Sequence, residues 1–413
     1  MKIVIATAVY YPMINGVAVF SHNLAVGLAK RGNEVMVICP SQTGKNYTRM
    51  VDGVKTVYLK STMMKVYPDQ VHAVPPKKKF LGVELPRIIY KDGFKVSVFP
   101  MRQVKKALDG FKPDVVHIQV SDAIGLSVAM YARKHKIPVV TTAHNQPEVL
   151  TEPLHMPGFV RKPVNALLSA YFVNRQSKSD YVTMPTELAI ENLIGEKDLG
   201  VPMKAVSNGV NLAGFKPGKV SSSVREKYNI PSGVPVALYV GRVDPEKNVE
   251  LVIDAFSEAL ESVPNALLAI VGDGVDRLRL QDLVKKMGLT KSIRFYGRVI
   301  PPDLYDFYRM GWLFVTGSEI ETQGIVLIEA AASGLPLIAV NAGAVADVCL
   351  DGKNGELLLP GDVDGMAEAM VKILTDADSR KKYSVKSLEV AREHDFEHTL
   401  DEFEKIYREV ANK

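Results

Sequence analysis

Hydrophobic positions in the first half of the chain form either short continuous runs or stretches with helical spacing. Residues 1–9 are almost all apolar, which is typical of a strand that is covered on both faces. Residues 17–31 then place Phe20, Leu24 and Leu28 at a spacing of four, which predicts an amphipathic helix. The same order continues, with strands expected at 34–39, 115–119 and 138–142 and helices at 102–111 and 123–135.

The second half of the chain repeats this alternation. Strands are expected at 235–240, 266–271, 292–296, 313–316 and 335–340, and helices at 248–260, 277–287, 302–310, 363–375 and 379–410. Between the halves, residues 207–235 are rich in Gly, Pro and Ser, which predicts a linker. Strands that alternate with helices favour parallel sheets, so the pattern predicts an α/β protein with two similar halves.

Composition narrows the class of protein. The 413 residues are 47% hydrophobic and 23% charged, which is typical of a soluble globular enzyme with two or three domains. A net charge of +5 is too small to indicate a nucleic-acid partner, but it is compatible with an anionic membrane surface or a phosphorylated ligand. The two cysteines, Cys39 and Cys349, favour a reducing cytosol over a disulfide scaffold. No spacing of Cys or His indicates a metal site, and no apolar run is long enough to predict a transmembrane helix.

Polar residues that directly follow predicted strands are candidates for ligand binding, because open parallel sheets bind ligands beyond the carboxyl ends of their strands. The stretch YVGRVDPEKNVELVIDAF, residues 239–256, places Gly241, Arg242 and Lys247 between a strand and the start of a helix. Arginine can bind two phosphate oxygens at once, and lysine adds a point charge beside the helix amides. The stretch therefore predicts a diphosphate site; the alternative is a pair of solvated cations on a surface turn.

A second stretch, SEIETQGIVLIEAAASGLPLIAV, residues 318–340, predicts a helix with Thr322 as its N-cap. The amides that follow the cap suit phosphate oxygens. Glu321 lies at the mouth of this helix, and Glu329 lies about two turns inside it, where a carboxylate could accept the vicinal hydroxyls of a ribose. The alternative is that Glu321 caps the helix and Glu329 pairs with another charge. The chain has neither the phosphate-loop nor the dinucleotide-binding glycine motif, which disfavours a nucleoside triphosphatase and a dinucleotide oxidoreductase.

Three residues of the first half follow strands and are weaker candidates. Gly16 lies between a strand and a helix, where it could bring backbone amides close to a ligand. His117 and His144 both end strands, and His144 is the better functional candidate because it lies at a strand exit. A lone histidine is more often a structural residue, so both interpretations stay open.

The segment 154–181 combines Met, Phe, Leu and Tyr with basic residues. The basic residues are Arg161, Lys162, Arg175 and Lys178. A basic amphipathic helix of this kind can lie on an anionic lipid surface. The alternative is a helix that packs on the core and carries solvated basic ends.

The stretches SNGVNLAGFKP (207–217), YVGRVDPEKNVELVIDAF and ETQGIVLIE (321–329) resemble the retaining glycosyltransferases of family 4, and the last matches their Glu-x7-Glu motif. The resemblance covers nearly the whole chain. It implies the α/β GT-B architecture, in which two facing Rossmann-like domains enclose a deep cleft. Residues 1–207 would bind the acceptor and residues 208–390 the nucleotide sugar, and the C-terminal helix, 391–413, would cross back to the first domain.

The resemblance also implies roles for individual residues. Those implied for the donor site are Gly16, Gly241, Arg242, Lys247, Arg298, Glu321, Gly324, Ile325, Val326 and Glu329. Those implied for catalysis are His144, Glu321, Arg242 and Lys247. Arg242 and Lys247 would hold the diphosphate and Glu329 the ribose, while Glu321 would contact the sugar and His144 would lie near the anomeric carbon. The family needs no metal site, so no metal and no other cofactor is expected.

The ETQG form of the motif and the basic-aromatic helix resemble bacterial diacylglycerol glucosyltransferases. This implies UDP-glucose as donor, a diacylglycerol-type lipid as acceptor, and a cytoplasmic protein that is peripheral on the inner face of the cell membrane. Two alternatives remain: a mannosyltransferase that uses GDP-mannose with phosphatidylinositol or a soluble acceptor, and a non-catalytic protein that binds sugar nucleotides.

Overall fold

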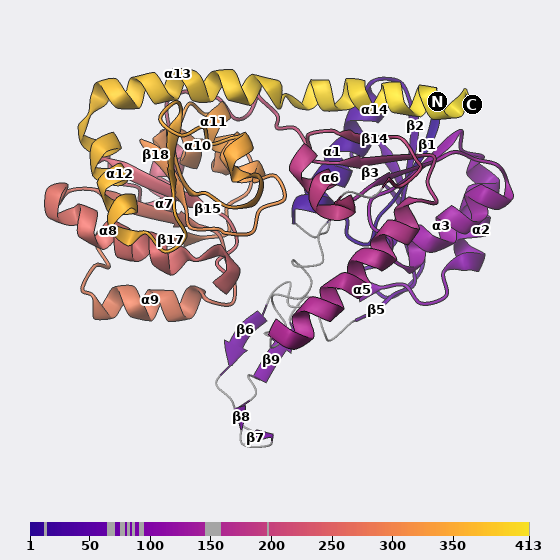
Figure 1. The fold of residues 1–413 in the computed structure, drawn as a ribbon, viewed down its shortest axis with the longest axis horizontal. Coiled ribbons are helices and arrows are strands. Elements are labelled where there is room, and N and C mark those ends of the chain that lie inside the picture. Colours follow the sequence, from indigo (N-terminus) through magenta and orange to yellow (C-terminus); the bar gives the residue numbers. More distant parts are fainter. Residues whose placement is uncertain are drawn as a thin grey trace. The chain divides into compact units, whose positions relative to one another are not determined.

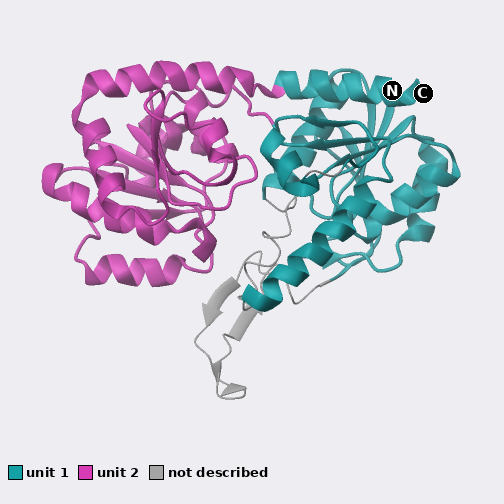
Figure 2. Cartoon of the chain, in the orientation of Figure 1, with its two compact units in different colours: residues 1–69, 92–208, 397–413 teal, residues 70–91, 209–396 magenta. Residues whose placement is uncertain are grey.

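The protein forms two compact units, which Figure 2 colours separately. The structure, a computed structural model, describes residues 1–11, 15–63, 71–74, 79–80, 83–84, 87–90, 95–144, 158–195 and 198–412. Unit 1 comprises residues 1–69, 92–208 and 397–413, and unit 2 comprises residues 70–91 and 209–396. The last residues of the chain therefore belong to the same unit as the first.

Unit 1 is built on one eight-stranded sheet. Its strands are β1 (Lys2–Ala6), β2 (Glu34–Pro40), β3 (Tyr47–Val51), β4 (Val54–Leu59), β11 (Val115–Ile118), β12 (Val139–Thr142), β13 (Tyr181–Met184) and β14 (Met203–Ala205). Their order is β14-β13-β12-β11-β1-β2-β4-β3, and every neighbouring pair is parallel except β3 and β4. The helices are α1 (Gly16–Lys30), α2 (Met101–Phe111), α3 (Ala123–Lys134), α5 (Gly158–Gln176), α6 (Glu187–Ile194) and α14 (Phe396–Ala411).

Six short strands form separate antiparallel pairs. They are β5 (Thr62–Met63) with β10 (Lys95–Val96), β6 (Val71–Val74) with β9 (Arg87–Tyr90), and β7 (Lys79–Phe80) with β8 (Val83–Glu84).

The first helix forms where the spacing of its apolar residues predicts it. Asn15 is the N-cap of α1, and its side chain accepts a hydrogen bond from the amide of Ala18 at 2.9 Å. Phe20, Leu24 and Leu28 are all buried, which confirms the predicted apolar face. The cap at Asn15 places the start of α1 at Gly16, after the loop that follows β1.

Unit 2 is built on a six-stranded, fully parallel sheet. Its strands are β15 (Val236–Val240), β16 (Leu267–Val271), β17 (Ile293–Gly297), β18 (Leu313–Thr316), β19 (Leu337–Val340) and β20 (Gly355–Leu358), in the order β17-β16-β15-β18-β19-β20. Its helices are α7 (Ser222–Tyr228), α8 (Val249–Ser262), α9 (Arg277–Lys286), α10 (Asp303–Met310), α11 (Ile325–Ala332), α12 (Val363–Thr375) and α13 (Ala377–Glu393), with short 3₁₀ helices η2 (Pro245–Lys247) and η3 (Gly343–Asp347).

Helices cover both faces of this sheet (Figure 1). Leu238 of β15 belongs to a buried cluster with residues of α10, α11 and α13, whereas its neighbours Ala237 and Tyr239 belong to a second cluster with residues of α8, α9 and α12. Successive side chains of a strand point to opposite faces, so a sheet covered on both sides needs apolar residues at every position. This explains why the strands appear in the sequence as continuous apolar runs.

Two expectations about the chain were wrong. The boundary between the units lies at residues 208 and 209, within the expected linker 207–235, but the rest of that stretch is not a linker, because Val210, Phe215, Val224 and Ile230 are buried in the core of unit 2 and α7 lies within it. The single helix expected at 379–410 is two helices, α13 and α14. The backbone between them is bonded instead to Val210, whose amide donates to His394 O at 2.8 Å and whose carbonyl accepts from the amide of Phe396 at 3.1 Å.

Candidate functional site

Three neighbouring strands of unit 2 end in glycines that pack backbone against backbone. Gly241, Gly272 and Gly297 lie at or directly after the ends of β15, β16 and β17, and the amide of Gly272 donates to Gly297 O at 2.8 Å. Gly272 has a φ of +144°, and a Cβ there would lie 1.7 Å from the carbonyl oxygen of Gly241. Only glycine fits this contact. Arg298, which follows Gly297, is exposed at the same carboxyl-terminal edge of the sheet as Arg242.

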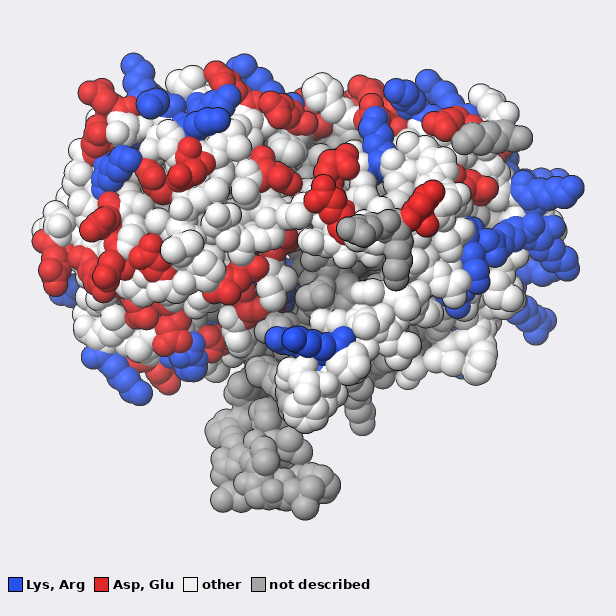
Figure 3. Space-filling model, viewed as in Figure 1, with Lys and Arg blue, Asp and Glu red and all other residues white. Residues whose placement is uncertain are grey.

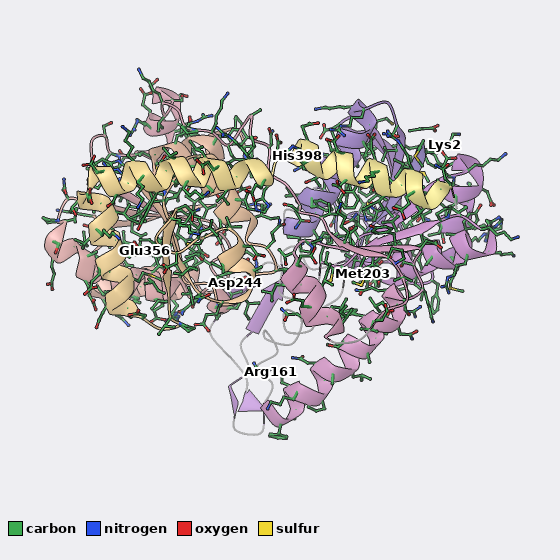
Figure 4. The ribbon with its side chains drawn as sticks, turned by 45° about the horizontal axis from the view of Figure 1, so that its top comes forward. Lys2, Arg161, Met203, Asp244, Glu356 and His398 are labelled. Carbon is green, nitrogen blue, oxygen red and sulfur yellow. The ribbon has the colours of Figure 1, made fainter. Side chains whose placement is uncertain are left out.

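Arg242 contacts two carboxylates of its own loop. Its guanidinium donates to Glu246 Oε1 at 2.6 Å and to Asp244 Oδ2, and its side chain is 47% exposed. Asp244 is held in turn by the amide of Val275, which donates to its Oδ1 at 2.9 Å. Figure 4 labels Asp244 on this loop. The expected phosphate-binding arginine is therefore anchored and half exposed, and an anion would compete with these carboxylates for it.

Lys247 and Glu321, which lie far apart in the sequence, form an ion pair. Lys247 Nζ donates to Glu321 Oε1 at 2.7 Å, to Ser318 Oγ at 3.2 Å and to the carbonyl of Ile320 at 3.3 Å. The two charged side chains are only 16% and 15% exposed. The structure thus connects the end of η2 to the loop that opens α11, and it brings together two of the residues implied for catalysis.

A buried tyrosine lies close to both of these groups of charges. The hydroxyl of Tyr239 donates to the carbonyl of Arg242 at 2.5 Å. Burial raises the pKa of this phenol well above its usual value, and the charge of Glu321 raises it further while Arg242 lowers it. The charges of Glu321 and Arg242 both change the pKa of Tyr239, so the loop of Arg242 and the loop that opens α11 both lie close to this tyrosine.

The first turn of α11 differs from the expectation in one respect. The N-cap is Gly324, not Thr322, and it has a left-handed φ of +72°. This positive φ disfavours any residue with a side chain, and a Cβ at Gly324 would also displace Leu327 Cδ1, which would lie only 2.8 Å away. The amide of Leu327 donates back to Gly324 O at 2.8 Å. The amides of Ile325 and Val326 precede the intrahelical hydrogen bonds and lie at the positive end of the helix dipole, where they suit an anion.

Glu329 lies in the same helix and is mostly buried beside a tyrosine of α10. The hydroxyl of Tyr308, itself fully buried, donates to Glu329 Oε2 at 2.6 Å. Burial raises the pKa of Glu329 to about 7, although the hydrogen bond from Tyr308 acts in the opposite direction. The carboxylate therefore titrates near neutral pH, with Oε2 held by Tyr308. The sequence reasoning missed Tyr308; the only available signal was that a carboxylate in an apolar helix needs a buried donor.

The raised pKa of Glu329 predicts a pH-dependent stability. The folded protein binds the proton of Glu329 up to about pH 7, whereas an ordinary glutamate loses it near 4.5. Stability should therefore fall as pH rises between these values, by about 2–3 kcal/mol relative to Glu329→Gln. Urea unfolding of both proteins at pH 5, 6, 7 and 8 measures the difference. If the stability of wild type and Glu329→Gln changed in parallel with pH, the raised pKa of Glu329 would be contradicted. Tyr308→Phe removes a hydrogen bond that lowers this pKa, so its loss of stability should extend to higher pH.

Gly16 and His144 belong to unit 1. Gly16 is the exposed first residue of α1. His144 follows β12, and its Nε2 lies 2.6 Å from Gln119 Oε1, while the ring of Phe20 packs edge-on at 5.2 Å. Burial lowers the pKa of His144 to about 4, so the ring is neutral at physiological pH. Asn145, which the sequence places beside it, lies outside the described residues.

His117 is fully buried, with Tyr407 Oη 2.6 Å from Nδ1 and Thr142 Oγ1 2.7 Å from Nε2. It is therefore a structural residue that ligands do not reach, as the alternative interpretation held. Gln119 lies two residues after His117 and contacts both His117 and His144. It was not identified from the sequence, because these contacts depend on how the strands pair.

Residues 154–157 of the basic-aromatic segment lie outside the described residues, and the described part forms α5, which begins at Gly158. Arg161 lies near its start (Figure 4), Lys162 and Arg175 lie further along it, and Lys178 follows its end. Phe159 and Leu167 are 82% and 72% exposed, which is more than a core-packing helix would leave in water. The helix therefore presents apolar and basic side chains together.

Neither a metal site nor a membrane span is evident in the part of the chain that the structure describes. No group of three or more His, Cys, Asp or Glu side chains there is arranged to hold a metal ion. None of the described helices is both long enough and apolar enough to cross a bilayer.

Comparison with known proteins decides the family. Residues 14–213 match "Glycosyltransferase Family 4" and residues 220–389 match "Glycosyl transferases group 1". The chain is 30% identical over 363 residues to an alpha-monoglucosyldiacylglycerol synthase of Acholeplasma laidlawii, which covers 86% of this chain and 84% of that protein. The chain belongs to glycosyltransferase family 4.

Two further relatives bear on this glycosyltransferase. It is 29% identical over 390 residues to a GDP-mannose-dependent alpha-mannosyltransferase of Mycolicibacterium smegmatis, covering 93% of this chain and 91% of that protein. A solved structure of HepE from Anabaena in complex with UDP-glucose superposes with a TM-score of 0.70 at 16% identity, covering 99% of this chain and all of that one. The glycosyltransferase therefore has the GT-B fold, which consists of two Rossmann-like units.

Proposed function

We propose that this glycosyltransferase transfers glucose from UDP-glucose to a diacylglycerol-type lipid, with retention of the anomeric configuration and without a metal ion. The observation that carries the proposal is the arrangement in unit 2: Lys247 is bonded to the loop that opens α11, and Glu329 lies in that helix beside Tyr308. The name of the Acholeplasma laidlawii relative supports glucose and the lipid acceptor. The UDP-glucose complex of the structural neighbour supports the donor.

The proposed donor site uses the charges of unit 2. The diphosphate is bound by Lys247 and Arg242 and by the amides of Gly324, Ile325 and Val326. Glu329 accepts hydrogen bonds from the ribose hydroxyls. In the structure Glu321 is paired with Lys247. When the diphosphate binds Lys247 in its place, Glu321 becomes available to the sugar hydroxyls. We assign Arg298 to the base, Gly16 to the diphosphate and His144 to the sugar.

The proposed reaction is a same-face substitution at the anomeric carbon. The bond from this carbon to the diphosphate oxygen breaks, and a bond to the acceptor oxygen forms on the same face. The acceptor's proton passes to the departing phosphate oxygen. Negative charge grows on the diphosphate as the bond breaks, and Lys247 and the first amides of α11 stabilise this charge because they are already in place.

A transfer assay tests the proposal. The protein is incubated with radiolabelled UDP-glucose, UDP-galactose or GDP-mannose and vesicles that contain diacylglycerol and phosphatidylinositol. We expect label from UDP-glucose in a glucosyl diacylglycerol whose anomeric configuration is that of the donor. Donor binding with neither transfer nor hydrolysis would instead indicate a non-catalytic protein.

A mannosyltransferase is the second candidate, because the Mycolicibacterium smegmatis relative covers more of the chain at nearly the same identity. This alternative predicts that GDP-mannose, and not UDP-glucose, labels phosphatidylinositol or a soluble acceptor in the same assay.

A lipid acceptor requires the protein to reach a membrane surface, and unit 1 offers two basic and apolar surfaces. The first is α5, with Phe159 and Leu167 exposed beside its basic residues. The second, which the sequence reasoning missed, precedes and includes α2, where Phe99 is 90% exposed and Arg102 and Lys106 face solvent. Figure 3 shows Lys and Arg side chains gathered over α2 and α3 and at the start of α5. We propose that both surfaces contact the inner face of the cell membrane.

Charge reversal on α5 is expected to weaken binding to vesicles. The variant changes four residues to Glu, namely Arg161, Lys162, Arg175 and Lys178. Each basic residue near an anionic surface contributes about 1 kcal/mol, so binding to phosphatidylglycerol vesicles should fall at least about a hundredfold. The matched control reverses four exposed lysines of unit 2, namely Lys285, Lys286, Lys381 and Lys382. Equal sedimentation of the two variants would contradict a specific surface on α5. Phe99→Ser tests the second surface in the same assay.

A further inference from the structure

A chain of buried polar groups crosses the sheet of unit 1. Tyr407 Oη of α14 lies 2.6 Å from Nδ1 of His117, and Thr142 Oγ1 lies 2.7 Å from its Nε2. Thr142 Oγ1 lies in turn 2.6 Å from Thr183 Oγ1. Gln119 Nε2 lies 3.2 Å and 3.1 Å from the two ring nitrogens of His117. All five side chains are at most 2% exposed, so each polar atom must find its partner within the protein.

This series of buried hydrogen bonds determines which way the amide of Gln119 points. Both ring nitrogens of His117 already have hydroxyl partners, and Gln119 Nε2 is nearly equidistant from them. A neutral imidazole presents negative charge density to such a neighbour, so it favours the NH₂ group of the amide over its oxygen. Burial keeps His117 neutral, with its pKa lowered to about 3. The amide oxygen of Gln119 therefore faces away from His117 and toward His144.

The orientation of Gln119 in turn determines the tautomer of His144. Gln119 Oε1 can only accept a hydrogen bond, and it lies 2.6 Å from His144 Nε2, so this nitrogen must carry the proton. A neutral imidazole has one proton, which leaves Nδ1 as an acceptor. Among the residues that the structure describes, none forms a hydrogen bond with Nδ1.

We propose that Gln119 is a positioning residue that holds His144 with its proton on Nε2, so that Nδ1 accepts a hydrogen bond from a hydroxyl of the donor sugar. The proposal rests on the proposed function, which places His144 at the sugar. His144 then orients the sugar and does not act as an acid through Nδ1. Gln119 takes its own orientation from His117, which α14 holds through Tyr407.

The tautomer can be read directly in the wild-type protein. Histidine labelled with ¹⁵N in the ring gives distinct signals for protonated and unprotonated nitrogens, and His144→Gln identifies the signals of His144 among the eight histidines. At pH 7.5 we expect the proton on Nε2 and none on Nδ1. A proton on Nδ1 would overturn the proposal, whether or not the protein transfers sugar, so its failure is separate from failure of the proposed function.

Variants of Gln119 test the consequence for the reaction. Gln119→Leu removes the acceptor, and we expect a mixture of tautomers and a kcat about tenfold lower. The Kd for UDP, which carries no sugar, should stay within about twofold of wild type, since Gln119 acts only through His144. Gln119→Glu keeps an acceptor for the proton on Nε2 and should keep the wild-type tautomer. Gln119→Leu with the wild-type tautomer and kcat would overturn the positioning role. Should this variant not fold, the wild-type spectrum still decides the tautomer.

Discussion

Replacing Lys247 with methionine is expected to reduce glucosyl transfer by about a hundredfold to a thousandfold, the cost of removing one group that stabilises charge in a transition state. Lys247 is largely buried, so in the proposed donor site its charge would act on the diphosphate with little screening by solvent. The loss should appear mainly in kcat, because negative charge grows on the diphosphate as its bond to the sugar breaks. Steady-state kinetics with UDP-glucose and diacylglycerol vesicles measure it.

The same substitution also breaks the ion pair with Glu321, so its structural and chemical effects have to be separated. Lys247→Met alone leaves Glu321 largely buried without a partner, which should cost about 1–3 kcal/mol of stability. Adding Glu321→Gln should restore much of this stability but none of the activity. Lys372→Met is the matched control, since Lys372 forms a 2.6 Å ion pair with Glu356 in the same unit, outside the proposed site. If the double variant recovered transfer, Lys247 would be only a structural residue.

The second large effect is a pH-dependent affinity for the donor. In the proposed donor site the ionised form of Glu329 accepts hydrogen bonds from the ribose hydroxyls, and burial raises the pKa of this carboxyl to about 7. The Kd for UDP-glucose should therefore rise as pH falls below 7, approaching about tenfold per pH unit, and should level off above about pH 8. UDP-glucose is the better probe, because the terminal phosphate of UDP itself titrates in this range. Calorimetry between pH 6 and 8.5 measures the profile.

Two variants assign this profile to Glu329. Glu329→Gln cannot ionise, and we expect its Kd to be independent of pH and roughly a hundredfold weaker than wild type at pH 8, since charged hydrogen bonds contribute about 1.5–3 kcal/mol each. Tyr308→Phe removes the hydrogen bond that favours the ionised form, so its profile should shift to higher pH. An unchanged slope in Glu329→Gln would show that another group controls donor affinity.

Much of the fold could be predicted because burial imposes a simple pattern. In unit 2 both faces of the sheet are covered, so β15 and its neighbours had to appear as continuous apolar runs. The stretch 207–235 misled the interpretation, because glycine, proline and serine dominate its composition while a few apolar residues such as Phe215 fix it to the core. The break between α13 and α14 depends on backbone bonds to Val210, about 180 residues earlier, which no local pattern contains.

The candidate site was predictable where chemistry and local sequence coincide. Lys247 and Glu321 were both expected at the diphosphate and sugar, and the structure joins them in one ion pair. The cap preference that favoured Thr322 does not decide the start of α11, because Gly324 closes the turn with a positive φ and packs tightly against Leu327. Tyr308 and Gln119 were missed because each partners a residue on a different element.

The most direct test of the central claim is a crystal structure of the protein with UDP-glucose. We predict diphosphate oxygens within about 3 Å of Lys247 Nζ and of the amides of Ile325 and Val326, with the ribose hydroxyls on Glu329. A diphosphate bound elsewhere, with Lys247 still paired to Glu321 and Glu329 without a ribose, would contradict the account.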